Sequence, residues 1–211
     1  MRTDELIRLL AAQAGPAPRG LVWRRLAPAL LTGMVCSVAL ALLSYPMVPS
    51  ALLSTPLWWL KLSYALALAA GAAWLIGRLA RPAVSDTLPR RGVWLSLGAM
   101  LLLGLADWLN AEPGQRAAQV MGHSWATCPR NVLLLSLPAM AACFWAMREL
   151  APTRARWAGA AVGLCAGGLG AAGYALICDE TAPSFVAVWY TLGILAAAGL
   201  GALLGPRLLR W

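Results

Sequence analysis

The sequence predicts an all-α, polytopic membrane protein with six transmembrane helices and both termini in the cytoplasm. Of its 211 residues, 61% are hydrophobic and only 12% are charged, and the mean hydropathy is +0.70. A soluble domain carries about 25% charged residues, so this chain has more apolar surface than one aqueous core can bury. Six apolar segments follow one another, each with about the 17–25 residues that a helix needs to cross a bilayer.

Residues 1–25 are expected to form a cytoplasmic segment and linker ahead of the membrane domain. Thr3 suits a helix N-cap, and Asp4 and Glu5 suit the first helical turn. The apolar face of this short helix is formed by Leu6, Ile7, Leu9 and Leu10. The helix should end before the Gly-Pro-Ala-Pro stretch at 15–18. Two interpretations stay open: a helix lying on the lipid surface, or a recognition helix that folds onto a cytoplasmic partner.

Residues 26–211 are expected to form a six-helix transmembrane domain. The segments are placed at 26–45, 57–77, 92–110, 131–147, 157–177 and 185–205. Backbone groups inside a bilayer must be satisfied within the segment, which favours helices. Glycine is dense in the fifth and sixth segments, and small residues let helix backbones approach closely. We therefore expect these two helices to lie within the helix contacts of the bundle.

The orientation follows from the basic residues. If the connections alternate between the two sides, 14 of the 17 lysines and arginines lie on the side of the termini. Only Lys61, Arg116 and Arg130 lie on the other side. Cytoplasmic loops carry the excess of Lys and Arg, so both termini should be cytoplasmic. Lys61, beside Trp58 and Trp59, is expected to anchor the second helix at the outer interface.

Several function classes are disfavoured. The spans hold almost no ionisable groups, whereas transporters and pumps need polar groups at mid-membrane, so a small-solute transporter is kept only as an alternative. The chain has no HExxH, GxSxG, P-loop or CxxC motif, so we expect neither an enzyme nor a cofactor. The net charge of +9 would suggest nucleic acid for a soluble protein, but here it follows the topology, and no direct nucleic-acid binding is expected.

The outer connections carry the candidate chemistry. The loop 122–130 holds the only histidine, His123, together with Cys128, and Cys178 lies in the other outer connection. On an oxidising face the two thiols can form a disulfide, either static or part of a switch. Alternatively, Cys128 and Cys178, with His123 as a third ligand, bind a soft metal ion such as cadmium. Three further cysteines lie within the spans and are expected to be small hydrophobes buried in the membrane: Cys36, Cys143 and Cys165.

A series of short motifs resembles one known family. They are Met1-Arg2-Thr3-Asp4-Glu5-Leu6-Ile7, Trp59-x-Lys61-x-x-Tyr64, Arg81-Pro82, Ser124-Trp125-x-x-Cys128-Pro129, Leu135-Ser136-Leu137-Pro138, Cys178-Asp179-Glu180 and Phe185-x-x-x-Trp189-Tyr190. In this order the motifs resemble those of the NrsF-type membrane anti-sigma factors, six-helix proteins that negatively regulate an extracytoplasmic-function (ECF) sigma factor. The resemblance extends nearly from end to end of the chain.

The resemblance implies a multi-pass protein of the bacterial inner membrane whose cytoplasmic N-terminal segment holds an ECF sigma factor away from RNA polymerase. It also implies that Cys128 and Cys178 match the two periplasmic cysteines of the family and sense redox or heavy-metal stress. The residues expected to bind the sigma factor are Asp4, Glu5, Leu6, Ile7, Leu9 and Leu10. The main alternative is a structural or assembly membrane protein whose outer disulfide is permanent.

Overall fold

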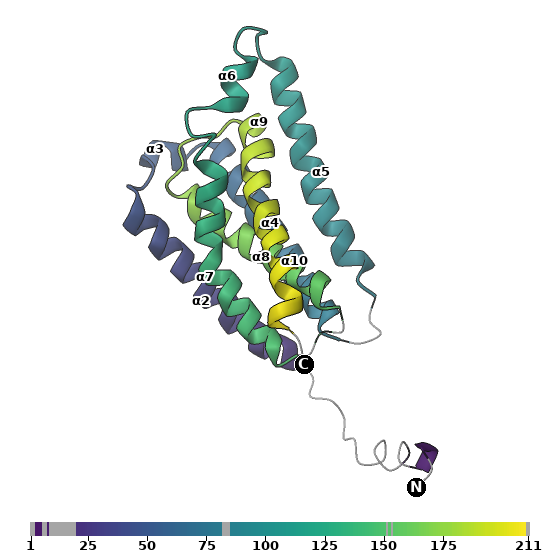
Figure 1. The fold of residues 1–211 in the computed structure, drawn as a ribbon. Coiled ribbons are helices and arrows are strands. Elements are labelled where there is room, and N and C mark those ends of the chain that lie inside the picture. Colours follow the sequence, from purple (N-terminus) through teal and green to yellow (C-terminus); the bar gives the residue numbers. More distant parts are fainter. Residues whose placement is uncertain are drawn as a thin grey trace.

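The architecture is helical throughout the described part of the chain. The computed structural model describes residues 3–5, 8, 20–81, 85–150, 152 and 154–209, and every regular element among them is a helix (Figure 1). Six of these helices are long and apolar enough to cross a membrane. The prediction of an all-α fold with six membrane-length helices is therefore confirmed.

The six long helices correspond one for one to the six predicted segments. Their bounds are α2 Leu21–Ser44, α4 Pro56–Leu79, α5 Thr87–Asn110, α7 Cys128–Arg148, α8 Ala155–Ala175 and a last span Pro183–Leu208. Two short helices, α3 Ser50–Leu53 and α6 Arg116–Met121, lie in the connections. α2 and α5 begin one turn earlier than predicted, because backbone hydrogen bonding continues past the apolar residues through Arg24 and Arg25 and through Arg90 and Arg91.

Helix α8 lies at the centre of the bundle, and almost all of its residues are buried. It packs against α10, α4, α7 and α2. The close approach depends on glycine: a Cβ at Gly163 would lie 2.8 Å from the Cα of Ala198, and one at Gly168 would lie 2.8 Å from the carbonyl oxygen of Ala65. The expected position of the fifth and sixth segments inside the helix contacts is confirmed, since α10 in turn packs against α8 and α7.

Helix α5 lies at the edge of the bundle. It packs along α4 and, near its own last turns, against the start of the final span (Figure 1). It is also the least buried of the six long helices. On one side, α5 borders a groove that α4, α8 and α10 also line.

The last span is not a uniform α-helix. It consists of α9 Pro183–Phe185, a π-helical segment η1 Val186–Tyr190 and α10 Thr191–Leu208. The apolar pattern of this segment did not reveal the π-helix. The wider turn precedes Thr191, whose Oγ1 lies 2.7 Å from the hydroxyl oxygen of Tyr64 on α4, and this hydrogen bond joins the two helices. π-Helical turns are frequent at functional sites.

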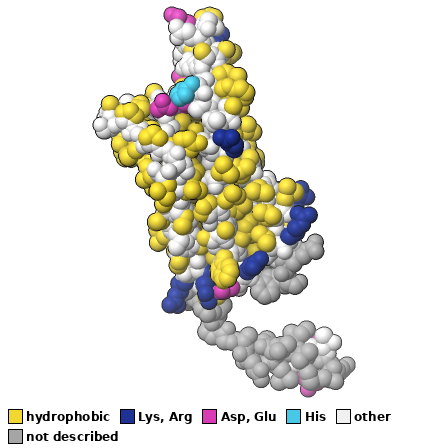
Figure 2. All heavy atoms as spheres, turned by 60° about the vertical axis from the view of Figure 1, so that its left-hand side comes forward, with side chains coloured by type: hydrophobic (Ala, Val, Ile, Leu, Met, Phe, Trp, Pro, Cys, Tyr) yellow, Lys and Arg dark blue, Asp and Glu magenta, His cyan; other side chains and the backbone are white. Residues whose placement is uncertain are grey.

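The two ends of the bundle differ in charge. Figure 2 shows an apolar middle with Lys and Arg gathered toward one end and His123 with neighbouring acidic side chains at the other. We call the first the arginine end and the second the histidine end. The arginine end is defined by arginines at the ends of the long helices, namely Arg24, Arg25, Arg78, Arg148, Arg154 and Arg207. At the arginine end Arg25 pairs with Glu149 at 3.0 Å and Arg148 Nε donates to the Leu208 carbonyl at 3.2 Å. The start of α2 and the end of the last span therefore lie at the same end of the bundle, as the alternation of connections predicts.

Candidate functional site

Cys128 and Cys178 meet at the histidine end of the bundle. Cys128 is the first residue of α7, and Cys178 follows the last turn of α8, with its N–H donating to the Tyr174 carbonyl at 3.0 Å. The two thiols lie close enough for their charges to interact, and both are free. The structure thus brings together two residues that are 50 positions apart in the sequence.

Both thiols are buried, which the sequence did not indicate. Cys128 is 0% exposed and Cys178 is 3% exposed, so the expectation that they are open to external oxidants is wrong for this state. The reason is that the two connections fold over the end of the bundle instead of leaving it open. Of the three cysteines expected to be buried in the membrane, Cys36 lies on the outward face of α2, whereas Cys143 and Cys165 are buried among the helices. An apolar helix does not show in its sequence which face meets its neighbours.

Lys61 is the buried cation of this site. Its side chain is 1% exposed, and Nζ donates to the carbonyl oxygens of Cys178 at 2.6 Å and Glu180 at 2.9 Å. The same Nζ lies 5.6 Å from the centre of the Tyr190 ring, a cation–π contact. Lys61 therefore holds the connection that carries Cys178, and its predicted role as an interfacial anchor is wrong. Of the two tryptophans beside Lys61 in the sequence, Trp59 is exposed and Trp58 is buried.

Lys61 also lies close enough to Cys128 for their charges to interact. Thiolate, not thiol, is the form that attacks disulfides and oxidants and that binds metal ions. An ammonium beside a thiolate stabilises it electrostatically, and this effect is stronger where water is excluded. Burial of the sulfur disfavours the thiolate of Cys128 and the neighbouring Cys178 adds to this cost, so the ammonium of Lys61 offsets only part of it.

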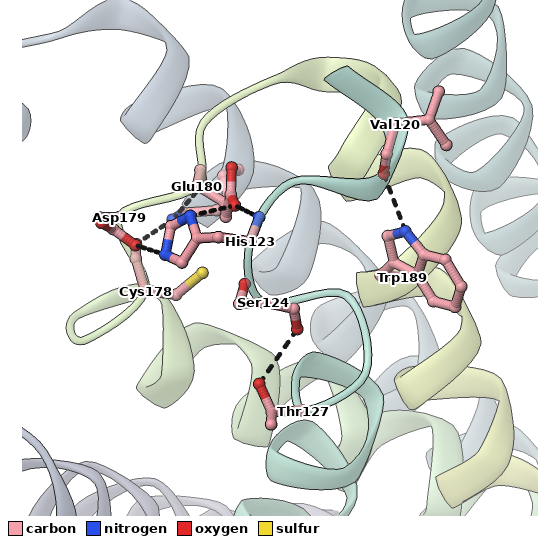
Figure 3. Close-up of polar contacts among 9 residues, drawn as sticks. Val120, His123, Ser124, Thr127, Cys178, Asp179, Glu180 and Trp189 are labelled. Atoms are coloured by element: carbon pink, nitrogen blue, oxygen red, sulfur yellow. Dashed lines mark hydrogen bonds and ion pairs between the residues drawn. The ribbon is translucent and has the colours of Figure 1, made fainter. Parts of the chain in front are cut away.

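A contact between His123 and Glu180 joins the two connections close to Cys178 (Figure 3). One carboxylate oxygen of Glu180 accepts the backbone N–H of His123 at 2.7 Å and also pairs with its Nδ1 at 2.7 Å. The Nε2 of the same ring lies 3.2 Å from a carboxylate oxygen of Asp179. Gly122 has φ +52°, and a Cβ there would lie 2.7 Å from the Glu180 carboxyl carbon, so this turn needs glycine.

The environment of His123 bears on the predicted metal site. Both ring nitrogens face carboxylates, and among the described residues no group of three or more His, Cys, Asp and Glu side chains is arranged to hold a metal ion. The structure therefore joins Cys128 to Cys178 but directs His123 to Asp179 and Glu180. Metal binding by the two thiols with His123 stays a prediction.

Three further hydrogen bonds join the elements at this end of the bundle. Asp107, near the end of α5, accepts the Ser184 N–H at 3.1 Å and the Gln119 side chain at 3.0 Å. Trp189 of η1 donates from Nε1 to the Val120 carbonyl at 2.9 Å. Lys61 and Asp107 are rare ionisable residues within the spans, and charged residues in membrane segments are usually functional or structural keystones. This rule on charged residues in membrane segments could have identified Lys61 and Asp107 from the sequence as part of this site.

The Glu180–His123 contact leads to a prediction about access to the thiols. Replacing Glu180 with alanine removes the acceptor that holds both the backbone and the ring of His123, so we expect the connections to open more often. In protein that retains only Cys128 and Cys178, a water-soluble maleimide should label the thiols about tenfold faster, which corresponds to the loss of about one hydrogen bond to a charged group.

Asp179→Ala is the matched control, because Asp179 is the adjacent acid and makes the longer contact, 3.2 Å, with the same ring. It should change the labelling rate only slightly. Equal rates for the Glu180 variant and the unsubstituted protein would show that the contact does not limit access.

The predicted sigma-binding residues lie apart from this site in the sequence. Asp4 and Glu5 are helical and exposed. The remaining four, Leu6, Ile7, Leu9 and Leu10, lie outside the described residues.

Fold and site together define a class: a helical protein with six membrane-length helices, one strongly basic end and a buried thiol pair at the other. Residues 10–211 match the model of the family described as NrsF, negative regulator of sigma F, and the chain belongs to this family. It is 36% identical over 213 residues to the probable anti-sigma-F factor NrsF of Azospira oryzae. It is 38% identical over 219 residues to the anti-sigma-F factor NrsF of Caulobacter vibrioides.

Both alignments cover 100% of this chain and 100% of the relative. The family resemblance of the sequence motifs is therefore confirmed. No solved structure matches the chain.

Proposed function

We propose that this protein is a membrane-bound anti-sigma factor. In this proposal it holds an ECF sigma factor through the cytoplasmic residues 1–25 and releases it on redox or heavy-metal stress sensed by Cys128 and Cys178. The observation that carries the proposal is membership of the NrsF family over residues 10–211, with two full-length relatives named as anti-sigma-F factors. The buried thiol pair beside Lys61 supports the sensing step.

The proposed location is the bacterial inner membrane, with the arginine end in the cytoplasm and the histidine end in the periplasm. The charge difference between the two ends of the bundle supports this orientation. Reporter fusions after Arg81 and after Arg154 should be active in the cytoplasm, and a fusion near Gln115 should be active in the periplasm. A cytoplasmic result at Gln115 would reverse the orientation and remove the thiols from the oxidising side.

The proposed chemistry at the thiol pair has two forms. In the oxidative form, Cys128 and Cys178 lose two protons and two electrons and form one S–S bond, while a peroxide accepts them and becomes two water molecules. In the metal form, the two thiols lose two protons and bind a soft divalent ion such as cadmium as thiolates. Both forms require a thiolate, and Lys61 offsets part of the cost of forming it in this buried place.

A change at the thiols has a direct structural route to the arginine end. Cys128 begins α7, and α7 ends at Arg148, next to Glu149, whose carboxylate pairs with Arg25 of α2 at 3.0 Å. α2 also packs closely on α7, since a Cβ at Gly33 would lie 2.6 Å from the Cα of Ala139. In this proposal a shift of α7 moves α2, and α2 carries the N-terminal segment.

The energy required is compatible with this chemistry. Moving a partner from mostly bound to mostly free takes several kcal/mol of differential affinity between two states of the bundle. A disulfide typically changes the stability of a fold by about 2–4 kcal/mol. Oxidation of one buried pair is therefore of the right order for the switch.

The test is co-purification. The full-length protein, extracted in detergent from cells that produce a candidate sigma factor, should carry that sigma factor and lose it after peroxide or cadmium treatment. Alkylation and intact mass measurement should show both outer thiols free before treatment. Absence of a sigma factor, together with a permanent disulfide, would favour the structural or assembly alternative.

A further inference from the structure

A groove opens where α5 diverges from the rest of the bundle in the arginine half. It has a volume of about 460 Å³ and is bordered by α4, α5, α8 and α10. Its walls are apolar and include Leu97 of α5, Leu164 of α8 and Leu195 of α10, and the small side chains of Ala160, Ala161 and Ala198 also line it. All four helices belong to membrane-length spans, so the groove lies at a depth where an apolar occupant is favoured over water.

The end of the groove at the arginine end is polar. Arg90 and Arg154 line it, together with Asp86, whose carboxylate lies 3.9 Å from an Arg90 nitrogen. Two guanidinium groups against one carboxylate leave this end positive. The Arg90 guanidinium lies 6.0 Å from the ring centre of Trp157, which is 63% exposed, and exposed tryptophans favour the level of lipid headgroups.

The length of the groove fits one lipid. Arg90 and Leu97 are seven residues apart on α5, or about 10 Å at 1.5 Å per residue. Half the hydrocarbon core of a bilayer is about 15 Å thick. A headgroup at the arginines therefore places an acyl chain along the apolar wall and within one leaflet.

From this match of charge, depth and apolar lining, we propose that the groove binds one phospholipid with an anionic headgroup from the cytoplasmic leaflet. Its phosphate contacts Arg90 and Arg154, and one acyl chain lies against Leu164. Basic pockets between membrane helices bind anionic headgroups in this way. A second groove at the arginine end is less suited, because its Arg25 is already paired with Glu149 at 3.0 Å. The inference rests on the membrane location proposed above and not on the sigma factor.

The experiment is native mass spectrometry of the full-length protein in detergent, titrated with phosphatidylglycerol or with phosphatidylcholine of the same acyl chains. The unsubstituted protein should bind one phosphatidylglycerol at least about tenfold more tightly than phosphatidylcholine, as expected for two basic contacts. The Arg90→Gln/Arg154→Gln protein should lose this preference. The matched control is Arg91→Gln/Arg156→Gln, which removes the same charge from adjacent, exposed positions that do not line the groove, and it should keep the preference.

A second variant tests the apolar part of the site. Ala160→Phe fills the groove while both arginines remain, and it should also lose the bound lipid. Equal affinity for the two lipids, unchanged binding by Arg90→Gln/Arg154→Gln, or an equal loss in the control would each overturn the proposal. Because lipid binding is measured on the protein alone, its failure is distinguishable from a failure to capture a sigma factor.

Discussion

Replacing Cys128 or Cys178 with serine is expected to abolish release of the sigma factor under stress, and replacing both should add nothing to either single change. A disulfide and a two-thiolate metal site each need both sulfurs, and residues that act as a unit are non-additive. Both thiols are free in the structure, and serine preserves their size, so the unstressed protein should still hold the sigma factor. A sigma-dependent reporter, measured with and without peroxide or cadmium, should stay at its uninduced level in all three variants.

Cys36→Ser is the control, since Cys36 is exposed on α2 and far in the sequence from the thiol pair. Its reporter should be induced as in the unsubstituted protein. Normal induction in both outer-cysteine variants would refute the thiol switch. High reporter activity without stress would instead show that the two residues stabilise the holding state.

The double substitution Leu6→Asp/Leu9→Asp is expected to release the sigma factor without stress. Helical periodicity places both leucines on the apolar face of the N-terminal segment, and each buried leucine contributes about 1.5–3 kcal/mol. Loss of both should weaken the complex about a hundredfold or more. The sigma factor should no longer co-purify, the reporter should be constitutively active, and the variant should remain in the membrane fraction.

Arg8→Asp is the matched control for this change. Arg8 lies two residues from Leu6, or about 200° around a helix, so the same acidic side chain is placed on the opposite face. Its effect on co-purification should be much smaller. Undiminished capture by the double variant would place the sigma-binding surface elsewhere, with the connections that hold Arg78, Arg81, Arg90 and Arg91 as the next candidates.

The number of long helices and their approximate positions were predictable because they depend on local properties. Length and apolarity along the chain identify a membrane-length helix without any knowledge of its neighbours. The alternation of such helices then assigns each connection to one end, which places Cys128 and Cys178 at the same end. Arginine content separated the two ends for the same reason.

Which faces of the helices are buried was not predictable, because helices that are apolar on every side carry no amphipathic pattern. Cys36 and Cys165 both lie in apolar segments, yet the first is exposed and the second is buried in α8. Only the packing of α8 among four other helices distinguishes them. The π-helical turn before Thr191, the residue that bonds Tyr64 of another helix, was not predictable either, because the apolar residues around it would fit an ordinary α-helix equally well.

The thiol site likewise combines features that the sequence predicts with features that only the tertiary contacts decide. His123, Cys128 and Cys178 were identifiable from residue type and topology, but Lys61 was assigned to the interface. Its partners are carbonyl oxygens 117 and 119 positions away, and Glu180 contacts His123 across 57 positions. A buried lysine is stable only where acceptors replace its lost water, and a sequence does not show which distant carbonyls will be there. The chain composition thus decided which helices are long and apolar enough to cross a membrane and which residues share an end. The tertiary contacts decided which thiols are enclosed and which charge lies beside them.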